Sequence, residues 1–185
     1  MIIKKLIMHN FGVYSSTNVL EFSSNKPVAL IGGMNGRGKT TILEAVLLSL
    51  YGSNSFAYTE SKFNTYGQYL KSYVNKANGT LETYLEIEFS MDDSDKEVYN
   101  VRREWDGKGI RVHEKISVKK NGEESAFLTE NWPMFVENIL PSALSSFFFF
   151  DGEKIAELAV EETSEQMKES IKAMLGIDLL HCTSP

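Results

Sequence analysis

The stretch Gly33-Met34-Asn35-Gly36-Arg37-Gly38-Lys39-Thr40 decides the fold of this chain. Its pattern of glycine, four residues, glycine, lysine and threonine is typical of a loop that wraps phosphate groups. The apolar run 28–31 precedes it and predicts a short strand buried on both faces. Over 39–50 the apolar residues follow the spacing of one helix face. Strand, glycine-rich turn and helix in this order predict an α/β fold.

The residue types of this loop suit a triphosphate. Glycines let successive backbone N–H groups point at phosphate oxygens, and the positive end of the helix dipole lies at the same place. Lys39 is expected to contact the β- and γ-phosphates, Thr40 to bind magnesium, and Thr41 to contact the α-phosphate. The predicted nucleotide-binding residues are Asn35, Gly36, Arg37, Gly38, Lys39, Thr40 and Thr41.

Hydrophobic patterning predicts the other elements. Apolar and acidic residues alternate over 81–89, which indicates a strand with one face in water. Residues 53–79 are expected to form loop plus a short helix. The other expected strands are 2–8, 19–22, 98–105 and 110–119, and the other expected helices are 132–140, 155–159 and 167–175.

Composition excludes several classes of protein. The 185 residues carry a net charge of −6, which argues against nucleic-acid binding by bulk charge alone. The apolar runs at the amino terminus are too short for a signal peptide or a membrane span, so the expected compartment is the cytoplasm. A single cysteine, Cys182, excludes an internal disulfide and a cysteine-built zinc site. His9, His113 and His181 are scattered and receive no metal or acid–base role.

The stretch Phe147-Phe148-Phe149-Phe150-Asp151-Gly152-Glu153 has three interpretations. Four apolar residues and an aspartate match the Walker B strand, whose carboxylate holds magnesium through water, although Gly152 stands where a catalytic carboxylate usually follows. A second interpretation is a loop that senses the γ-phosphate and its metal. The third is a core strand that ends in an Asp-Gly turn.

Basic residues gather in the region 102–120. One interpretation is a surface that contacts the DNA backbone. The other is a solvated hairpin face, because Glu104, Asp106 and Glu114 dilute the positive charge. The basic residues are Arg102, Arg103, Lys108, Arg111, Lys115, Lys119 and Lys120.

With these motifs, the chain resembles the amino-terminal lobe of SMC-like DNA-repair ATPases of the SbcC and RecF type. The segment 3–11 is similar to their first strand, 33–41 to their phosphate loop, 99–103 to their lobe I sheet, and 147–157 to their Q-loop region. The string Phe147–Ile155 is similar, more narrowly, to the DndD proteins of bacterial DNA phosphorothioation systems.

The resemblance implies a P-loop NTPase half-lobe of the ABC/SMC head type, with a mixed sheet around the phosphate-loop helix and an antiparallel β insert. Residues 1–160 would form lobe I of the ATPase head. Within it lie the phosphate loop 33–41, the β insert 81–120 and the Q-loop-like segment 147–153. Residues 161–185 would lead as a helix into a coiled coil. Asp151 would join Thr40 as a magnesium ligand.

The implied activity is ATP hydrolysis with Mg²⁺, in which two heads close on ATP and open after hydrolysis. The implied partners are DNA, other Dnd proteins, the protein's own carboxy-terminal lobe and a second head in a homodimer. The catalytic residues would lie in that carboxy-terminal lobe, beyond the coiled coil. We therefore expect a truncated chain that binds ATP weakly and hydrolyses it poorly.

Departures from the family pattern keep two alternatives open. Gly12 stands where many SbcC-like proteins carry a phosphate-binding arginine, Arg37 where a small residue is common, and Asp151 in place of the Q-loop glutamine. One alternative is an SbcC- or RecF-like repair ATPase that serves a nuclease. The other is a nucleotide-gated DNA clamp that never hydrolyses ATP.

Overall fold

A computed structural model describes residues 1–22, 28–34, 36–92, 95–109 and 111–149. The chain divides into two compact units, residues 1–142 and 143–185. The first unit contains the sheet, five of the helical segments described below and the glycine-rich loop. Of the second unit, only 143–149 are described.

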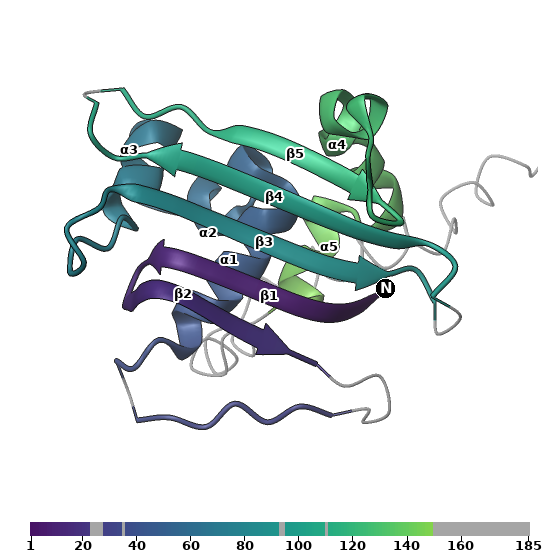
Figure 1. Cartoon of the computed structure of the whole chain (residues 1–185), viewed down its shortest axis with the longest axis horizontal. Helices are drawn as coiled ribbons and strands as arrows, with labels where there is room; N and C mark the ends of the chain where they lie inside the picture. The colour runs from purple at the N-terminus through teal and green to yellow at the C-terminus, as the bar shows by residue number, and fades with distance from the viewer. Residues whose placement is uncertain (23–27, 35, 93–94, 110, 150–185) are drawn as a thin grey trace, which may run out of the picture. The chain divides into compact units, whose positions relative to one another are not determined.

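Six antiparallel strands form one sheet in the order β2-β1-β3-β4-β5-β6 (Figure 1). The predicted amino-terminal hairpin is confirmed, and the predicted insert joins it, because β3 pairs with β1 and Ile87 lies opposite Leu6. The strands are β1 (Ile2–Phe11), β2 (Tyr14–Glu21), β3 (Glu82–Ser90), β4 (Val98–Asp106), β5 (Lys115–Lys120) and β6 (Glu123–Glu124). The predicted strand 110–119 is reduced to β5.

The two faces of the sheet differ because successive strand residues point to opposite sides. Leu85, Ile87 and Phe89 of β3 are fully buried on the inner face. Glu86 and Glu88 between them lie on the outer face, where they are partly exposed. Each buried side chain of this size stabilises the fold by about 1.5–3 kcal/mol.

In the first unit the helices cover the inner face of the sheet, and α1 (Lys39–Tyr51) is the central one (Figure 1). The second half of α1 is buried on all sides, including Leu47, Leu48 and Leu50, as expected for a helix that is apolar all round. The other helical segments are η1 (Gly52–Asn54), α2 (Phe56–Thr59), α3 (Tyr66–Ser72), α4 (Ala126–Ile139) and α5 (Ser142–Phe148).

Helix α4 begins earlier than the predicted 132–140. Ser125 caps it by accepting a hydrogen bond from Leu128 N at 3.3 Å. The helix then continues past Pro133, with non-helical dihedral angles at Asn131. The break follows from proline, whose ring and missing N–H disrupt the turn before it.

The strand predicted at 28–31 is wrong. Residues 28–34 have no regular secondary structure, and Val28, Leu30 and Ile31 are 68%, 94% and 45% exposed. A strand buried on both faces needs neighbouring strands for its backbone groups, and no described residue pairs with this run. The α/β class is confirmed, while every strand pairing among the described residues is antiparallel.

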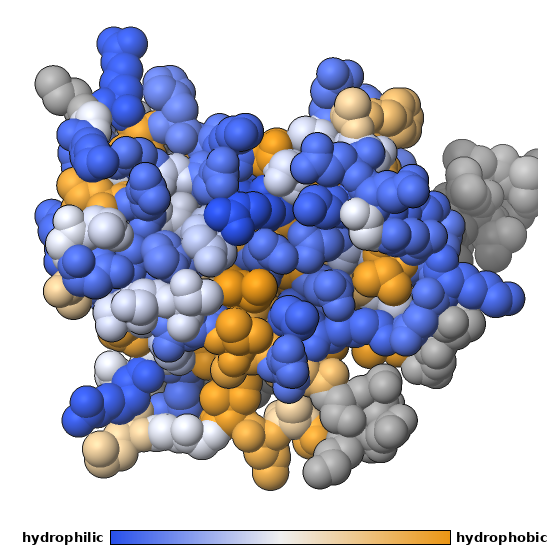
Figure 2. All heavy atoms as spheres, viewed as in Figure 1, coloured by the Kyte–Doolittle hydropathy of each residue, from blue (hydrophilic) through white to orange (hydrophobic). Residues whose placement is uncertain are grey.

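The outer face of the sheet is mostly hydrophilic, with hydrophobic side chains gathered where β1 and β2 run (Figure 2). Val19 of β2 is 49% exposed there. Among the described helices, none combines the length and the apolar character needed to cross a membrane.

Candidate functional site

The glycine-rich loop curls around the side chain of Lys39. Gly36 and Gly38 have positive φ angles of 76° and 98°, which side chains rarely tolerate. Lys39 Nζ donates to the carbonyl oxygens of Gly33 at 2.9 Å and Met34 at 3.1 Å. The ammonium group therefore lies against the start of the loop. Asn35, a predicted nucleotide contact, lies outside the described residues.

The amino end of α1 suits an anion. Gly38 is its N-cap, and the first turn contains no acidic residue. Arg37, Lys39 and Thr40 are exposed, and Thr41 is half-buried. The N–H groups of a first helical turn, the helix dipole and two cations at one place attract phosphate.

A magnesium ion fits this arrangement through Thr40, the second residue of α1. Magnesium usually keeps several waters and takes only one or two protein oxygens beside substrate phosphates. One exposed hydroxyl is therefore enough for the protein's share of the ligands. The second predicted ligand, Asp151, lies outside the described residues. Within the described part of the chain, no cluster of three or more His, Cys, Asp or Glu residues could hold a metal.

The turn between β1 and β2 packs against the amino end of α1. A Cβ atom on Gly12 would lie 2.5 Å from Thr41 Cγ2, and one on Gly38 would lie 2.6 Å from Val13 Cγ2. Tyr14 Oη donates to Gly38 O at 3.2 Å, and burial raises the pKa of this phenol. Gly12 also has a φ of 57°, so the position of the missing family arginine has no room for a side chain.

This turn is itself held by a buried asparagine that the sequence did not indicate. Asn10 is fully buried with φ 49°. Its Oδ1 accepts from Ser16 N at 2.8 Å, and its Nδ2 donates to Glu82 O at 2.9 Å. Gly12 N donates to Tyr73 O at 2.7 Å, which ties the turn to the end of α3. The turn that contacts the glycine-rich loop is therefore hydrogen-bonded to both β3 and the end of α3.

Comparison with known proteins places this geometry in a family. The AAA domain family matches residues 5–178. The chain belongs to the AAA domain family. It is also 29% and 28% identical to the DNA double-strand break repair Rad50 ATPases of Methanocaldococcus jannaschii and Pyrococcus abyssi, over 96% and 97% of this chain.

These alignments cover only 16% and 19% of the two Rad50 ATPases, so the chain spans less than a fifth of the curated relatives it matches. A 48-residue stretch, 26% of this chain and 5% of the relative, is 38% identical to the SbcC component of the SbcCD nuclease of Treponema pallidum. The SMC head domain of Thermotoga maritima superposes on 68% of this chain and 39% of that chain, with a TM-score of 0.41 and 24% identity.

None of the three interpretations of the segment 147–153 of this AAA domain is confirmed. Residues 142–148 form α5, a helix, so a Walker B strand and a core strand over 147–150 are both wrong for the residues described there. Asp151, Gly152 and Glu153 lie outside the described residues, and so does the predicted helical approach at 161–185. The interpretation as a nucleotide-sensing loop stays a prediction.

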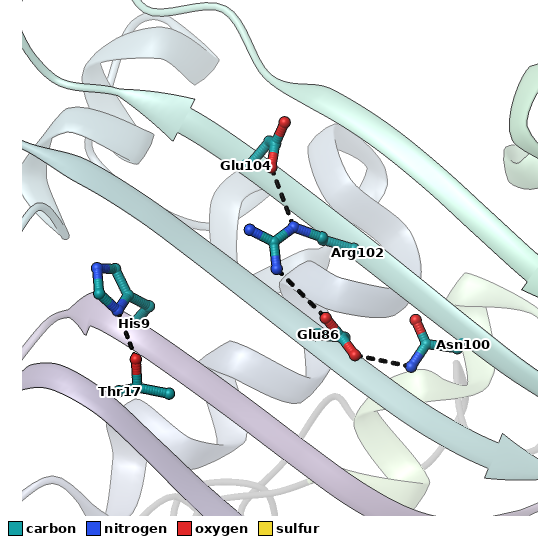
Figure 3. A network of polar contacts seen from close by, with 6 residues as sticks. All are labelled: His9, Thr17, Glu86, Asn100, Arg102 and Glu104. Atoms are coloured by element: carbon teal, nitrogen blue, oxygen red, sulfur yellow. Dashed lines mark hydrogen bonds and ion pairs between the residues drawn. The ribbon is translucent and has the colours of Figure 1, made fainter.

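Several of the predicted basic residues of the AAA domain are paired with acids. Arg102 donates to Glu104 at 3.0 Å and to Glu86 at 3.4 Å, and Asn100 donates to Glu86 at 2.8 Å (Figure 3). Partial burial lowers the pKa of Arg102, but the hydrogen bonds and charges of Glu104 and Glu86 outweigh it and leave the pKa raised. The hydrogen bond from Arg102 lowers the pKa of Glu104. Further ion pairs are Lys115–Glu104, Lys108–Asp106 and Lys120–Glu97. These ion pairs favour the interpretation as a solvated face over that as a DNA-backbone contact.

His9 also lies on this face, where Nδ1 is 2.8 Å from Thr17 Oγ1 (Figure 3) and the ring stacks on Tyr84 at 4.7 Å. His113 is exposed, and His181 lies outside the described residues. The absence of a metal or acid–base role stays a prediction for all three histidines.

Arg103 departs from the predicted basic surface because it points into the core. It is 4% exposed, beneath the sheet and against the end of α1. Strand alternation contains the signal that would have found it, since Val101 and Trp105 at ±2 are both buried. An arginine in that register is inward-facing.

Proposed function

We propose that this chain is the ATP-binding half of an SMC-like ATPase head, and that ATP-driven closure of such heads acts on DNA. The observation that carries the proposal is the exposed amino end of α1, with Lys39 curled into the loop and the β1–β2 turn packed behind it. The family match and the names of the Rad50 and SbcC relatives support the ATPase and DNA parts.

The apolar run 28–31 supports a partner lobe. Val28 and Leu30 are strongly exposed directly before the glycine-rich loop, and solvated apolar side chains of this size mark a surface that another element covers. In this proposal a carboxy-terminal lobe of the same protein supplies the neighbouring strands and the catalytic residues. A second head would complete the site in a homodimer.

Two biological settings fit the same head. The Rad50 and SbcCD names of the relatives favour DNA double-strand break repair beside a nuclease. The string 147–155 favours DNA phosphorothioation beside other Dnd proteins. Affinity purification of the full-length protein from its source, followed by mass spectrometry, separates them: a nuclease partner supports repair, and sulfur-transfer proteins support phosphorothioation.

Nucleotide binding is tested by titrating the 185-residue chain with a fluorescent ATP analogue and Mg²⁺. We expect weak binding by the parent and none by Lys39→Ala, because the loop loses the charge that faces the phosphates. Lys108→Ala is the matched control, since Lys108 is a solvent-exposed lysine distant in sequence from the loop. Binding of Lys39→Ala as tight as that of the parent would disprove the phosphate-loop assignment.

Hydrolysis separates an ATPase from a non-hydrolysing clamp. Single-turnover assays of the full-length protein with and without DNA are expected to release phosphate. The 185-residue chain alone should hydrolyse poorly, because phosphoryl transfer depends on a residue that positions the attacking water. No release by the full-length protein under either condition would favour the clamp.

A further inference from the structure

Side chains from β4 and α4 donate hydrogen bonds to the carbonyl groups at the carboxyl end of α1. Ser49 O accepts from Arg103 Nε at 3.0 Å. Leu50 O accepts from Trp132 Nε1 at 2.8 Å and from the Arg103 guanidinium at 3.4 Å. Gly52 N, the C-cap, donates to Leu48 O. The last carbonyl groups of a helix lack partners within the helix, and here three consecutive ones are satisfied.

Arg103 is itself held in place by an ion pair with Glu114. Its guanidinium donates to Glu114 Oε2 at 2.5 Å, and Tyr66 Oη donates to Glu114 Oε1 at 2.6 Å. Burial raises the pKa of Tyr66, and the charge of Glu114 raises it further, so the phenol stays a donor. Gly52 borders the guanidinium so closely that a Cβ there would collide with it. The buried cation thus meets a carboxylate and the negative end of the helix dipole.

We propose that Arg103 is a positioning residue for the phosphate-binding end of α1. This inference rests on the proposed function. Helix α1 has 13 residues, so about 20 Å separate its two ends, and a packed helix moves as a unit. Loss of the contacts at Ser49 and Leu50 lets the helix tilt or slide, which displaces Lys39 and Thr40 at the other end. Phosphate contacts lose strength when their donors move by a fraction of an ångström to one ångström.

The neighbouring residue offers a matched comparison on the same strand. Arg102 and Arg103 each pair with a glutamate, Glu104 and Glu114 respectively. The Arg102 pair lies on the outer face, away from α1, whereas the Arg103 pair contacts it. A general effect of charge removal in β4 would appear in both pairs, but loss of helix positioning would appear only in the second.

The test compares two double variants of the 185-residue chain, Arg103→Met/Glu114→Gln and Arg102→Met/Glu104→Gln. Each removes both charges of its pair, so Arg103 or Glu114 is never left buried without the other. In the outer variant Glu86 loses Arg102 but keeps the hydrogen bond from Asn100. After circular dichroism confirms folding, both are titrated with the fluorescent ATP analogue and Mg²⁺. We expect the inner variant to bind roughly tenfold more weakly than the parent and the outer variant to match it. Parental affinity in a folded inner variant overturns the proposal.

A second substitution covers the case in which the inner double variant fails to fold. Arg103→Lys keeps the positive charge, but one ammonium group cannot reach two carbonyls and a carboxylate together. We expect it to fold and to bind ATP with an affinity between those of the parent and the double variant. A folded Arg103→Lys chain with unchanged affinity contradicts the proposal.

Amide hydrogen exchange keeps this inference distinct from the proposed function. If the parent itself fails to bind ATP, the proposed function fails, but positioning is still measurable without nucleotide. The inner variant, or Arg103→Lys, should exchange faster over 39–45 of α1, and the outer variant should not. Equal exchange in the parent and the folded inner variant would refute positioning by Arg103.

Discussion

The two ends of α1 are built in opposite ways. The carboxyl end is buried, and Arg103, Trp132 and the C-cap Gly52 satisfy its carbonyl groups. The amino end is exposed, carries no side-chain cap, and meets the β1–β2 turn. In the proposed function the exposed end binds the nucleotide, while the buried end holds the helix in place. The difference teaches that solvent exposure and satisfied carbonyl groups lie at opposite ends of a single helix.

The largest expected effect is at the carboxyl end. Trp132→Ala removes a fully buried ring and the hydrogen bond to Leu50 O, so we expect a loss of about 3–5 kcal/mol in the free energy of unfolding. Urea denaturation measures it. Phe127→Ala on the same helix is the control, because Phe127 is 69% exposed and should cost within about 0.5 kcal/mol. Equal losses for the two variants would contradict the comparison.

Gly52→Ala should rank second. The new methyl group would collide with the Arg103 guanidinium, and the φ of 56° is unfavourable for alanine. We expect a loss of about 2–3 kcal/mol, measured by thermal and urea denaturation. Gly79→Ala is the matched control, since Gly79 also has a positive φ but faces open space, and should cost about 1 kcal/mol. A Gly52 variant no less stable than the Gly79 variant would refute the tight fit.

Gly12→Ala tests the amino end. The methyl group would press on Thr41 Cγ2, 2.5 Å away, and the backbone is again left-handed. We expect a loss of about 1–2 kcal/mol in stability together with weaker ATP binding. The control is Gly122→Ala, which has a φ of 85° and open surroundings, and which should leave ATP binding unchanged. If both variants bound ATP like the parent, the β1–β2 turn would have no part in holding the loop.

Tyr14→Phe should have the smallest effect. It removes the hydrogen bond to Gly38 O, so we expect about 0.5–1.5 kcal/mol of lost stability and a slight loss of ATP affinity. Burial raises the folded pKa of Tyr14 above 10.0, so the phenol's contribution is complete below pH 10 and is lost as the pH rises through the folded pKa. Unfolding measured from about pH 7 to about pH 11 checks this, and a parent–variant difference that grew with pH would contradict it.

Local patterns predicted the parts of the fold that depend on neighbouring residues in the sequence. The alternation over 81–89 and the helical spacing over 39–50 depend only on residues close in sequence, and the structure confirms them as β3 and α1. The glycine-rich loop is likewise a local pattern. The run 28–31 misled for the same reason, since its composition indicates a buried strand but cannot supply the strands that would pair with it.

By itself the sequence determined that this protein has an α/β fold with a phosphate-type loop leading into an apolar helix. Only the tertiary structure decided that Arg103 serves the end of that helix while adjacent Arg102 pairs on the outer face, and that Gly12 abuts Thr41. The physical reason is the sequence separation between the interacting residues. Backbone conformation and amphipathicity depend on residues a few positions apart, whereas the partner of a buried charge or the space beside a glycine depends on which distant segments the sheet brings together.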